Sequence, residues 1–148
     1  MPAGIDIRGA VQADAVDVAG LLGQLGYPME SRDAASRLEA LARDPDATVL
    51  VAAGYGPVVG VVVVNWCRML HHARPLARIT TLVVDDRERG CGIGRILVKA
   101  ASQTARMAGC DVLELTTGMH REAAHAFYRA IGFEQSSLRF SRSLRRKS

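Results

Sequence analysis

Apolar residues along the 148-residue chain group into short runs that suit strands and into stripes that suit helices. Apolar or β-branched runs predict strands at 5–8, 48–53, 58–66, 79–84 and 111–116, and looser alternation predicts a last strand at 133–142. Stripes at helical spacing predict helices at 13–25, 31–43, 93–108 and 121–130. This order, β-α-α-β-β-β-α-β-α-β, predicts an α/β (α+β) fold with a mixed sheet and helices on both faces.

Two connections set the expected directions of the strands. Gly54-Tyr-Gly-Pro57 is turn chemistry, so the strands on either side of it should form an antiparallel hairpin. A helix joins the strand at Ile79 to the strand at Val112, and such crossovers are parallel and right-handed. No linker, internal repeat or low-complexity segment is visible, so residues 1–148 are expected to form a single domain.

Composition restricts the class of protein without naming it. Apolar residues make up 49% of the chain and charged residues 23%, which is ordinary for a globular domain. The longest apolar run, Val58–Val64, is far shorter than the ~20 residues of a membrane span, and the first residues lack a signal-peptide pattern. Three widely spaced cysteines give neither a disulfide framework nor a metal pattern, which favours a reducing cytoplasm and no metal.

The net charge of +4 owes much to a basic tail at about residues 142–148. Such a tail can touch nucleic acid, but no aromatic residues interleave with its charges to stack on bases. A solvated terminus is the simpler interpretation, and nucleic acid is not an expected partner.

The most informative segment is the strand at 79–84 with the glycine-rich loop that follows it. The strand lacks polar alternation, so both of its faces are expected to be covered. Gly90, Gly92 and Gly94 allow backbone angles that side chains forbid, and the next helix points its free N–H groups and positive dipole end at the loop. This arrangement predicts an anion site, with a tight strand-to-helix turn without a ligand as the alternative.

The spacing within the loop decides which anion is expected. A Walker loop needs Gly-Lys-Ser/Thr where this chain has Gly94-Arg-Ile, and the dinucleotide spacing G-x-G-x-x-G does not fit either. From Arg89 the form is R-x-x-G-x-G, which resembles the acetyl-coenzyme A pyrophosphate loop of the GNAT N-acetyltransferase superfamily. Residues 124–133 are similar to that family's A-x-x-F-Y-x-x-x-G-F segment, and Arg8 with residues 14–27 resembles its opening strand and helix.

The resemblance implies the acyl-coenzyme A acyltransferase fold and transfer of an acetyl group from acetyl-coenzyme A to a primary amine of a small molecule or peptide. In the family, the pantetheine arm pairs with strand backbone, here that of Leu82, Val83 and Val84. Arg89 holds the family's Arg/Gln position. The expected N–H donors to the pyrophosphate are Gly90, Cys91, Gly92, Ile93, Gly94 and Arg95. Many relatives pair, so a homodimer is a further expectation.

Tyr128 sits where the family commonly has the tyrosine that protonates the departing thiolate of coenzyme A. Helical periodicity places it at the edge of the apolar stripe that contains Phe127, from where its ring can pack while its hydroxyl reaches a cleft. A phenol with a pKa near ~10 is a suitable acid for a thiolate whose thiol has a pKa near ~8.5. A packing tyrosine without chemistry is the alternative.

The chain departs from the family pattern on the acceptor side. Many members have an asparagine seven residues before the tyrosine, where this chain has Arg121, which cannot accept hydrogen bonds. Some members carry a glutamate as general base where this chain has Thr116-Thr117-Gly118, with Glu114 two residues earlier. Asp85 and Asp86 belong to the turn after the strand and are expected to be solvated, so no base is assigned.

The acceptor pocket is expected in the variable loops, which leaves the substrate undefined. The candidate contacts to the acceptor are Glu114, Thr116, His72 and His120. A non-catalytic acetyl-coenzyme A-binding regulatory module remains the alternative to an enzyme.

Overall fold

The computed structural model describes residues 4–116, 122–136 and 139–146. The chain divides into two compact units, Met1–Thr116 and Thr117–Ser148. The first unit holds the sheet, three α-helices and the glycine loop, and the second unit holds the last helix and the tail.

The first unit is built on one five-stranded sheet whose strands follow the order of the chain. Its strands are β1 (Asp6–Gly9), β2 (Ala47–Ala53), β3 (Val58–Cys67), β4 (Leu76–Val84) and β5 (Leu113–Leu115). Neighbouring strands are antiparallel from β1 to β4, and β5 is parallel to β4. The mixed sheet, the β2–β3 hairpin and the parallel crossover are therefore confirmed.

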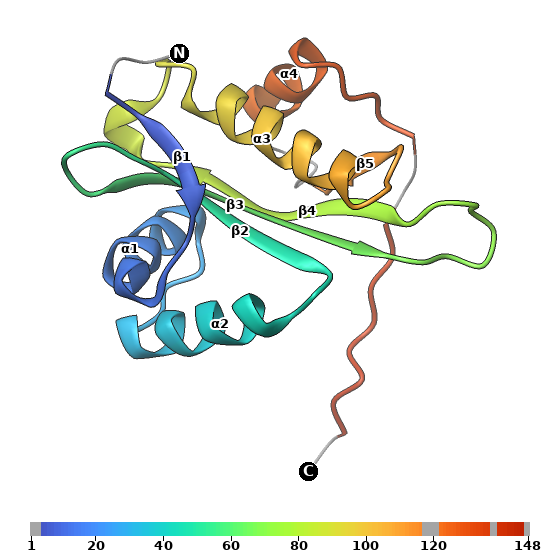
Figure 1. Ribbon diagram of the computed structural model, residues 1–148, viewed down its shortest axis with the longest axis horizontal. Helices are drawn as coiled ribbons and strands as arrows, with labels where there is room; N and C mark the ends of the chain where they lie inside the picture. The colour runs from blue at the N-terminus through green and yellow to red at the C-terminus, as the bar shows by residue number, and fades with distance from the viewer. Residues whose placement is uncertain (1–3, 117–121, 137–138, 147–148) are drawn as a thin grey trace. The chain divides into compact units, whose positions relative to one another are not determined.

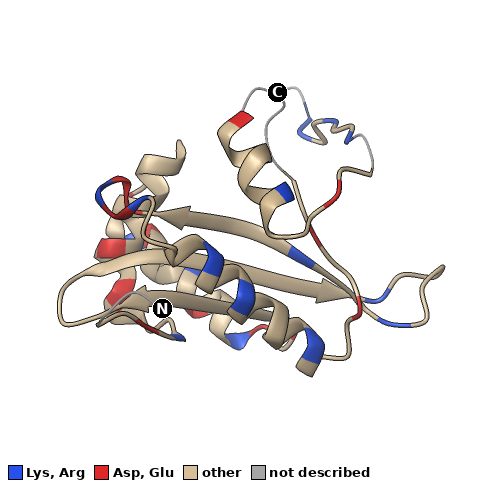
Figure 2. Cartoon of the chain, turned by 90° about the horizontal axis from the view of Figure 1, so that it is seen from above, with Lys and Arg blue, Asp and Glu red and all other residues tan. Residues whose placement is uncertain are grey.

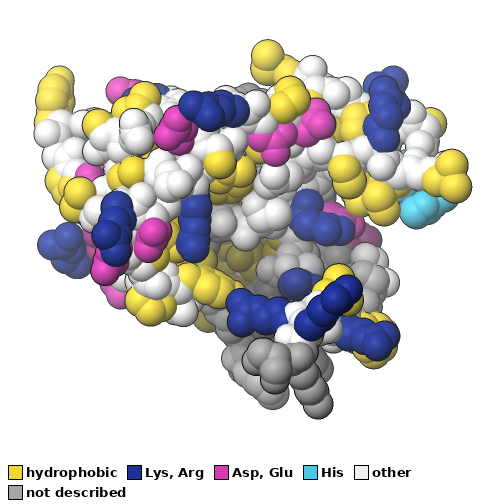
Figure 3. Space-filling view, turned by 90° about the horizontal axis from the view of Figure 1, so that it is seen from below, with side chains coloured by type: hydrophobic (Ala, Val, Ile, Leu, Met, Phe, Trp, Pro, Cys, Tyr) yellow, Lys and Arg dark blue, Asp and Glu magenta, His cyan; other side chains and the backbone are white. Residues whose placement is uncertain are grey.

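Helices cover both faces of this sheet, as Figure 1 shows. α1 (Ala15–Leu25) and α2 (Ser31–Arg43) pack on one face, and α3 (Ile93–Met107) packs on the other. The core under α1 and α2 joins apolar helix residues to strand valines, including Val18, Leu21, Leu38, Val51, Val61 and Val83. Burying each of the larger side chains contributes roughly 1.5–3 kcal/mol. The outer surface of α1 and α2 carries dispersed side chains of both charges (Figure 3).

An ion pair between the exposed Arg8 and the buried Asp14 fixes where α1 begins. Asp14 is 6% exposed, and each of its carboxylate oxygens accepts a hydrogen bond from the Arg8 guanidinium at 2.8 Å. The Val11 N–H donates to the same carboxylate at 2.8 Å, which closes a 3-10 turn at Gln12–Asp14. The hydrogen bonds from Arg8 are the main reason why the pKa of Asp14 is lowered. The α-helix predicted from residue 13 therefore begins only at Ala15.

The second unit contains α4 (Glu122–Ala130), which ends where Gly132 takes a φ of +100°. The Phe133 N–H donates to the Tyr128 carbonyl oxygen at 2.9 Å and turns the chain out of the helix. The last strand predicted at 133–142 is wrong for the described residues 133–136 and 139–142, which have no strand conformation. Phe140 is 90% exposed, so burial of its side chain does not stabilise an extended conformation there.

Candidate functional site

β4 and β5 pair only over a short ladder, because β5 ends after three residues. The ladder between them has three pairs: Ala77 with Leu113, Arg78 with Glu114, and Ile79 with Leu115. From Thr80 to Val84, β4 has β3 on one side and pairs with no described residue on the other. An unpaired edge presents backbone N–H and C=O groups, which an extended ligand with amide groups can bind as an additional strand.

A β-bulge lies next to the last pair of the β4–β5 ladder. The register between β3 and β4 shifts between Val63 and Val64, which leaves Thr80 as an extra residue in β4. A bulge bends its strand and interrupts its pairing, and here it directly follows Ile79, the last residue of β4 that pairs with β5. Thr80 is exposed, and its hydroxyl donates to Asn65 Oδ1 at 3.0 Å. The prediction that both faces of this strand are covered is therefore wrong at Thr80.

A turn organised by Asp85 connects β4 to the glycine loop. The Asp85 N–H donates to the Val59 carbonyl oxygen at 2.8 Å, which anchors the turn on β3. Its carboxylate accepts from the Arg87 N–H at 3.0 Å and caps a 3-10 turn at Asp86–Glu88. Hydrogen bonds from the Arg87 side chain and backbone lower the pKa of Asp85. Asp85 is only 7% exposed, so the prediction that it is solvated is wrong.

The glycines of the loop are required by backbone geometry. Gly90 and Gly92 have φ angles of +84° and +83°, in the left-handed region. An added Cβ would meet no atom within 4 Å at either position, so conformation and not space selects glycine there. Gly92 is the N-cap of α3 and has no side chain, so the N–H groups of Ile93, Gly94 and Arg95 receive no side-chain cap from it. These groups and the helix dipole together form a site suited to an anion.

Position 60 on β3 requires glycine because α3 approaches it closely, which the sequence analysis did not predict. A Cβ at Gly60 would lie 2.9 Å from Leu97 Cδ1 and 3.3 Å from Ile93 Cγ2. The first two turns of α3 therefore rest directly on the backbone of β3, opposite Val84 of β4. The available signal was one glycine in a strand of valines, which is typical of a close approach between elements.

Basic side chains surround the loop. Arg89 forms an ion pair with Asp86 at 2.8 Å, and the two side chains are 62% and 60% exposed. An exposed pair contributes about 0–1 kcal/mol, so Arg89 can exchange Asp86 for a bound phosphate at little cost. α3 itself bears Arg95 and Lys99 on its exposed surface and has no acidic residue. Figure 2 shows the basic positions along this helix.

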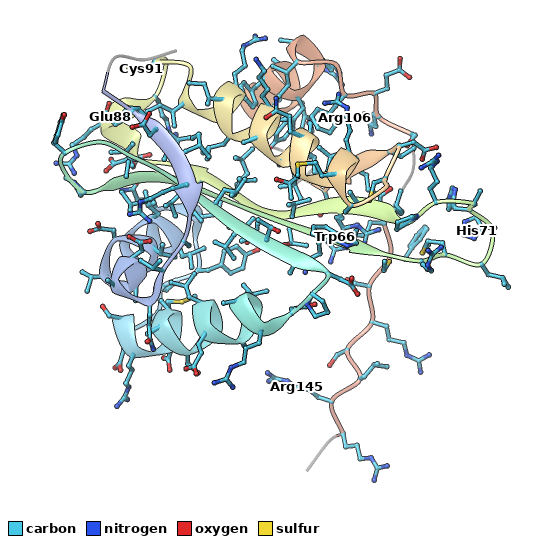
Figure 4. All side chains as sticks on the ribbon, in the orientation of Figure 1. Trp66, His71, Glu88, Cys91, Arg106 and Arg145 are labelled. Carbon is cyan, nitrogen blue, oxygen red and sulfur yellow. The ribbon has the colours of Figure 1, made fainter. Side chains whose placement is uncertain are left out.

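Two of the predicted acceptor contacts lie in different parts of the first unit. Arg78 Nε donates to Glu114 Oε1 at 2.9 Å, so Glu114 forms an ion pair across the β4–β5 ladder. His72 is exposed in the β3–β4 loop, with its ring centroid 4.4 Å from that of His71. Figure 4 shows His71 at the opposite end of the sheet from Cys91, so the structure does not gather His72 with the glycine loop.

The remaining candidate residues lie at the end of β5 and in the chain that follows it. Thr116 is exposed and follows β5 directly. His120 and Arg121 lie outside the described residues. Tyr128 is half-buried in α4, where its ring makes edge contacts with Phe127 at 5.5 Å and with Phe133 at 6.0 Å between centroids. The packing role of Tyr128 is thus observed, and its role as an acid stays a prediction.

The described residues lack the features of two other classes of protein. No helix there is long and apolar enough to cross a membrane. The same residues include no group of three histidines, cysteines or carboxylates that could hold a metal ion.

The model of the acetyltransferase (GNAT) family matches residues 19–133, which is most of the chain. The chain therefore belongs to the GNAT family of acetyltransferases. This finding confirms the predicted family, the fold class and the acyltransferase class.

The chain is similar to N-acetyltransferases that are named for different substrates. It is 39% identical over 101 residues to the aminoalkylphosphonate N-acetyltransferase of Salmonella typhimurium, covering 68% of this chain and 66% of that enzyme. It is 32% identical over 137 residues to the aminoglycoside N(6')-acetyltransferase type 1 of Stenotrophomonas maltophilia, covering 88% and 86%. A solved aminoglycoside N-acetyltransferase in complex with CoA shares the fold, with a TM-score of 0.83 and 18% identity over 95% of each chain.

Proposed function

We propose that this chain transfers an acetyl group from acetyl-coenzyme A to the primary amine of a small molecule or peptide by direct attack. The observation that carries the proposal is the open edge of β4, which leads through a short turn into the uncapped N-terminus of α3. Coenzyme A has an amide-containing pantetheine arm joined to a pyrophosphate. A strand edge followed by an anion site suits these two parts in that order.

Each part of the donor has a partner in this arrangement. The pantetheine amides pair with the backbone of Leu82, Val83 and Val84. The pyrophosphate accepts hydrogen bonds from N–H groups between Gly90 and Arg95, and Arg89 leaves Asp86 to pair with a phosphate. The exposed state of Gly90, Cys91, Gly92 and Arg95 supports this assignment, because no described residue between 4 and 116 covers these groups.

The transfer step follows from the placement of the thioester on the part of β4 beyond its ladder with β5. The neutral amine attacks the thioester carbonyl carbon while a backbone N–H of β4 stabilises the developing oxyanion. The carbon–sulfur bond then breaks, the amine loses a proton to water, and the thiolate takes a proton from the Tyr128 hydroxyl, which solvent replaces. Positioning and a preorganised oxyanion contact supply most of the acceleration.

The names of two relatives suggest small amines as the acceptors to test first. The first relative is named for aminoalkylphosphonates and the second for aminoglycosides, so both classes belong in the first panel of substrates. Polyamines, amino acids and peptides with free N-termini or lysines complete the panel. The basic residues around the loop serve the donor phosphates and do not define the acceptor.

Location and assembly are part of the proposal. Cys67, Cys91 and Cys110 are free thiols, which suits a reducing cytoplasm where acetyl-coenzyme A is available. We place all 148 residues in one functional domain and expect a homodimer, which light scattering of the purified protein measures directly.

The test is release of free thiol from acetyl-coenzyme A across the panel. The proposal expects turnover with at least one amine class, and saturation in both substrates. Tight binding of acetyl-coenzyme A with no thiol release for any amine would support the regulatory module in place of the enzyme.

A further inference from the structure

A single side chain links α1 to the turn that carries the glycine loop. Gln24 lies in the last turn of α1, and its Oε1 accepts a hydrogen bond from the Asp86 N–H at 2.9 Å, across 62 positions of sequence. Asp86 is the first residue of the 3-10 turn, so its N–H has no acceptor within that turn. The acceptor therefore comes from a different element of the first unit.

Other contacts fix the turn on both sides of Asp86. Before it, the Asp85 N–H is held by the Val59 carbonyl oxygen at 2.8 Å, and after it the Glu88 N–H donates to the Asp85 carbonyl oxygen at 2.9 Å. The link from this turn to α1 runs through Gln24, which accepts the Asp86 N–H and also donates toward the Asp85 carboxylate, a smaller contribution to the lowered pKa of Asp85. The chain that leaves the turn arrives at Gly90 two residues after Glu88. A shift in the direction of the turn is consequently carried into the loop.

We propose that Gln24 is a positioning residue for the glycine loop. By accepting the Asp86 N–H, it fixes the direction in which the chain leaves β4, and hence where the loop N–H groups point. Gln24 does not touch the coenzyme in this arrangement. The inference rests on the proposed function, because it assumes that the loop binds the pyrophosphate of coenzyme A.

The inference predicts a selective defect. Replacing Gln24 with Ala or Met removes the acceptor oxygen, and Met keeps the length of the side chain in contact with the turn. Loss of one such hydrogen bond corresponds to a Kd for coenzyme A raised about three- to tenfold. Pantetheine has no pyrophosphate, so its binding to the β4 edge is expected to stay unchanged.

The experiment titrates the wild type, Gln24→Ala, Gln24→Met and the control Gln103→Ala with coenzyme A by calorimetry. Pantetheine at millimolar concentration is tested by thermal shift, and hydrogen exchange of the Asp86 amide is followed by NMR. Gln103 is exposed on α3, and its side chain makes no hydrogen bond among the described contacts, so its variant should match the wild type. Both Gln24 variants should weaken coenzyme A binding and speed exchange at Asp86.

Two results would overturn the inference while the proposed function stands. One is wild-type affinity for coenzyme A in both Gln24 variants. The other is an equal loss of coenzyme A and pantetheine binding with a lowered melting temperature, which indicates a general structural role. A wild-type protein that binds neither coenzyme A nor acetyl-coenzyme A would instead contradict the proposed function and the inference with it.

Discussion

Substitution of Gly60 by alanine tests the close contact between α3 and the sheet. The new methyl group would lie 2.9 Å from Leu97 Cδ1 and 3.3 Å from Ile93 Cγ2. Leu97 is 0% and Ile93 is 2% exposed, so both side chains are enclosed by the core and would have to shift within it. Overpacking of this kind lowers the free energy of unfolding by about 1–3 kcal/mol. Replacing a glycine within a strand restores roughly 0.5–1 kcal/mol, because the unfolded chain has less conformational freedom. We expect a net loss of about 1 kcal/mol, or a melting temperature lower by about 2–4 °C.

A matched control has the opposite expected sign. Gly20 is exposed in α1, and an added Cβ there would meet no atom within 4 Å. Gly20→Ala should therefore raise stability by about 0.5–1 kcal/mol through helix propensity alone. Urea denaturation of both variants and the wild type measures the difference. A Gly60→Ala protein as stable as Gly20→Ala would refute the close packing of α3 on β3. It would also remove the argument that this packing holds the N-terminus of α3, and hence the glycine loop, in place.

Three further predictions address the charged and catalytic groups. Asp14→Asn should cost about 1–2 kcal/mol at neutral pH, because it breaks the ionic hydrogen bonds from Arg8. The pKa of Asp14 is lowered in the folded state, so this contribution is present above the ordinary carboxyl pKa near ~4 and is lost as pH falls through the lower folded value. Urea midpoints of wild type and variant should therefore converge as pH falls through that folded value, and a gap that persists at the acid end of the titration would contradict the assignment. Arg89→Ala should raise the Kd for acetyl-coenzyme A about tenfold or less and weaken the salt dependence of this Kd, since the ion pair with Asp86 is exposed. Calorimetry at two salt concentrations measures the Kd and its salt dependence. An unchanged salt dependence counts against the phosphate contact. Tyr128→Phe should lower kcat about 10²-fold or more without changing the Kd for acetyl-coenzyme A, and unchanged turnover at all pH values would remove Tyr128 from the role of acid.

The elements that local patterns define were predictable from the sequence. Helices α1, α2 and α3 have apolar stripes, and the strands from β2 to β4 are largely apolar or β-branched, so their limits were predicted to within a few residues. The glycines of the loop were also visible, because the left-handed angles at Gly90 and Gly92 exclude most other residues. The family resemblance depended on these local features.

Features that depend on pairing between elements were not predictable. The bulge at Thr80 and the open edge beyond Ile79 arise from registers with β3 and β5, which no local pattern records. Asp85 was expected in solvent because aspartates in turns usually are, whereas here its carboxylate caps the turn while its N–H anchors on β3. The last strand failed for the converse reason, since alternation alone does not make a strand where the apolar side chain stays in solvent, as Phe140 does at 90% exposed.

The most direct test of direct acetyl transfer is a balance of products. The protein is incubated with acetyl-coenzyme A and the best amine of the panel, and mass spectrometry counts free coenzyme A, N-acetylated amine and intact protein. The account predicts equal amounts of the two small products and no acetylated protein at any time. Coenzyme A released without N-acetylated amine, or an acetylated protein that forms and decays at the rate of turnover, would contradict it.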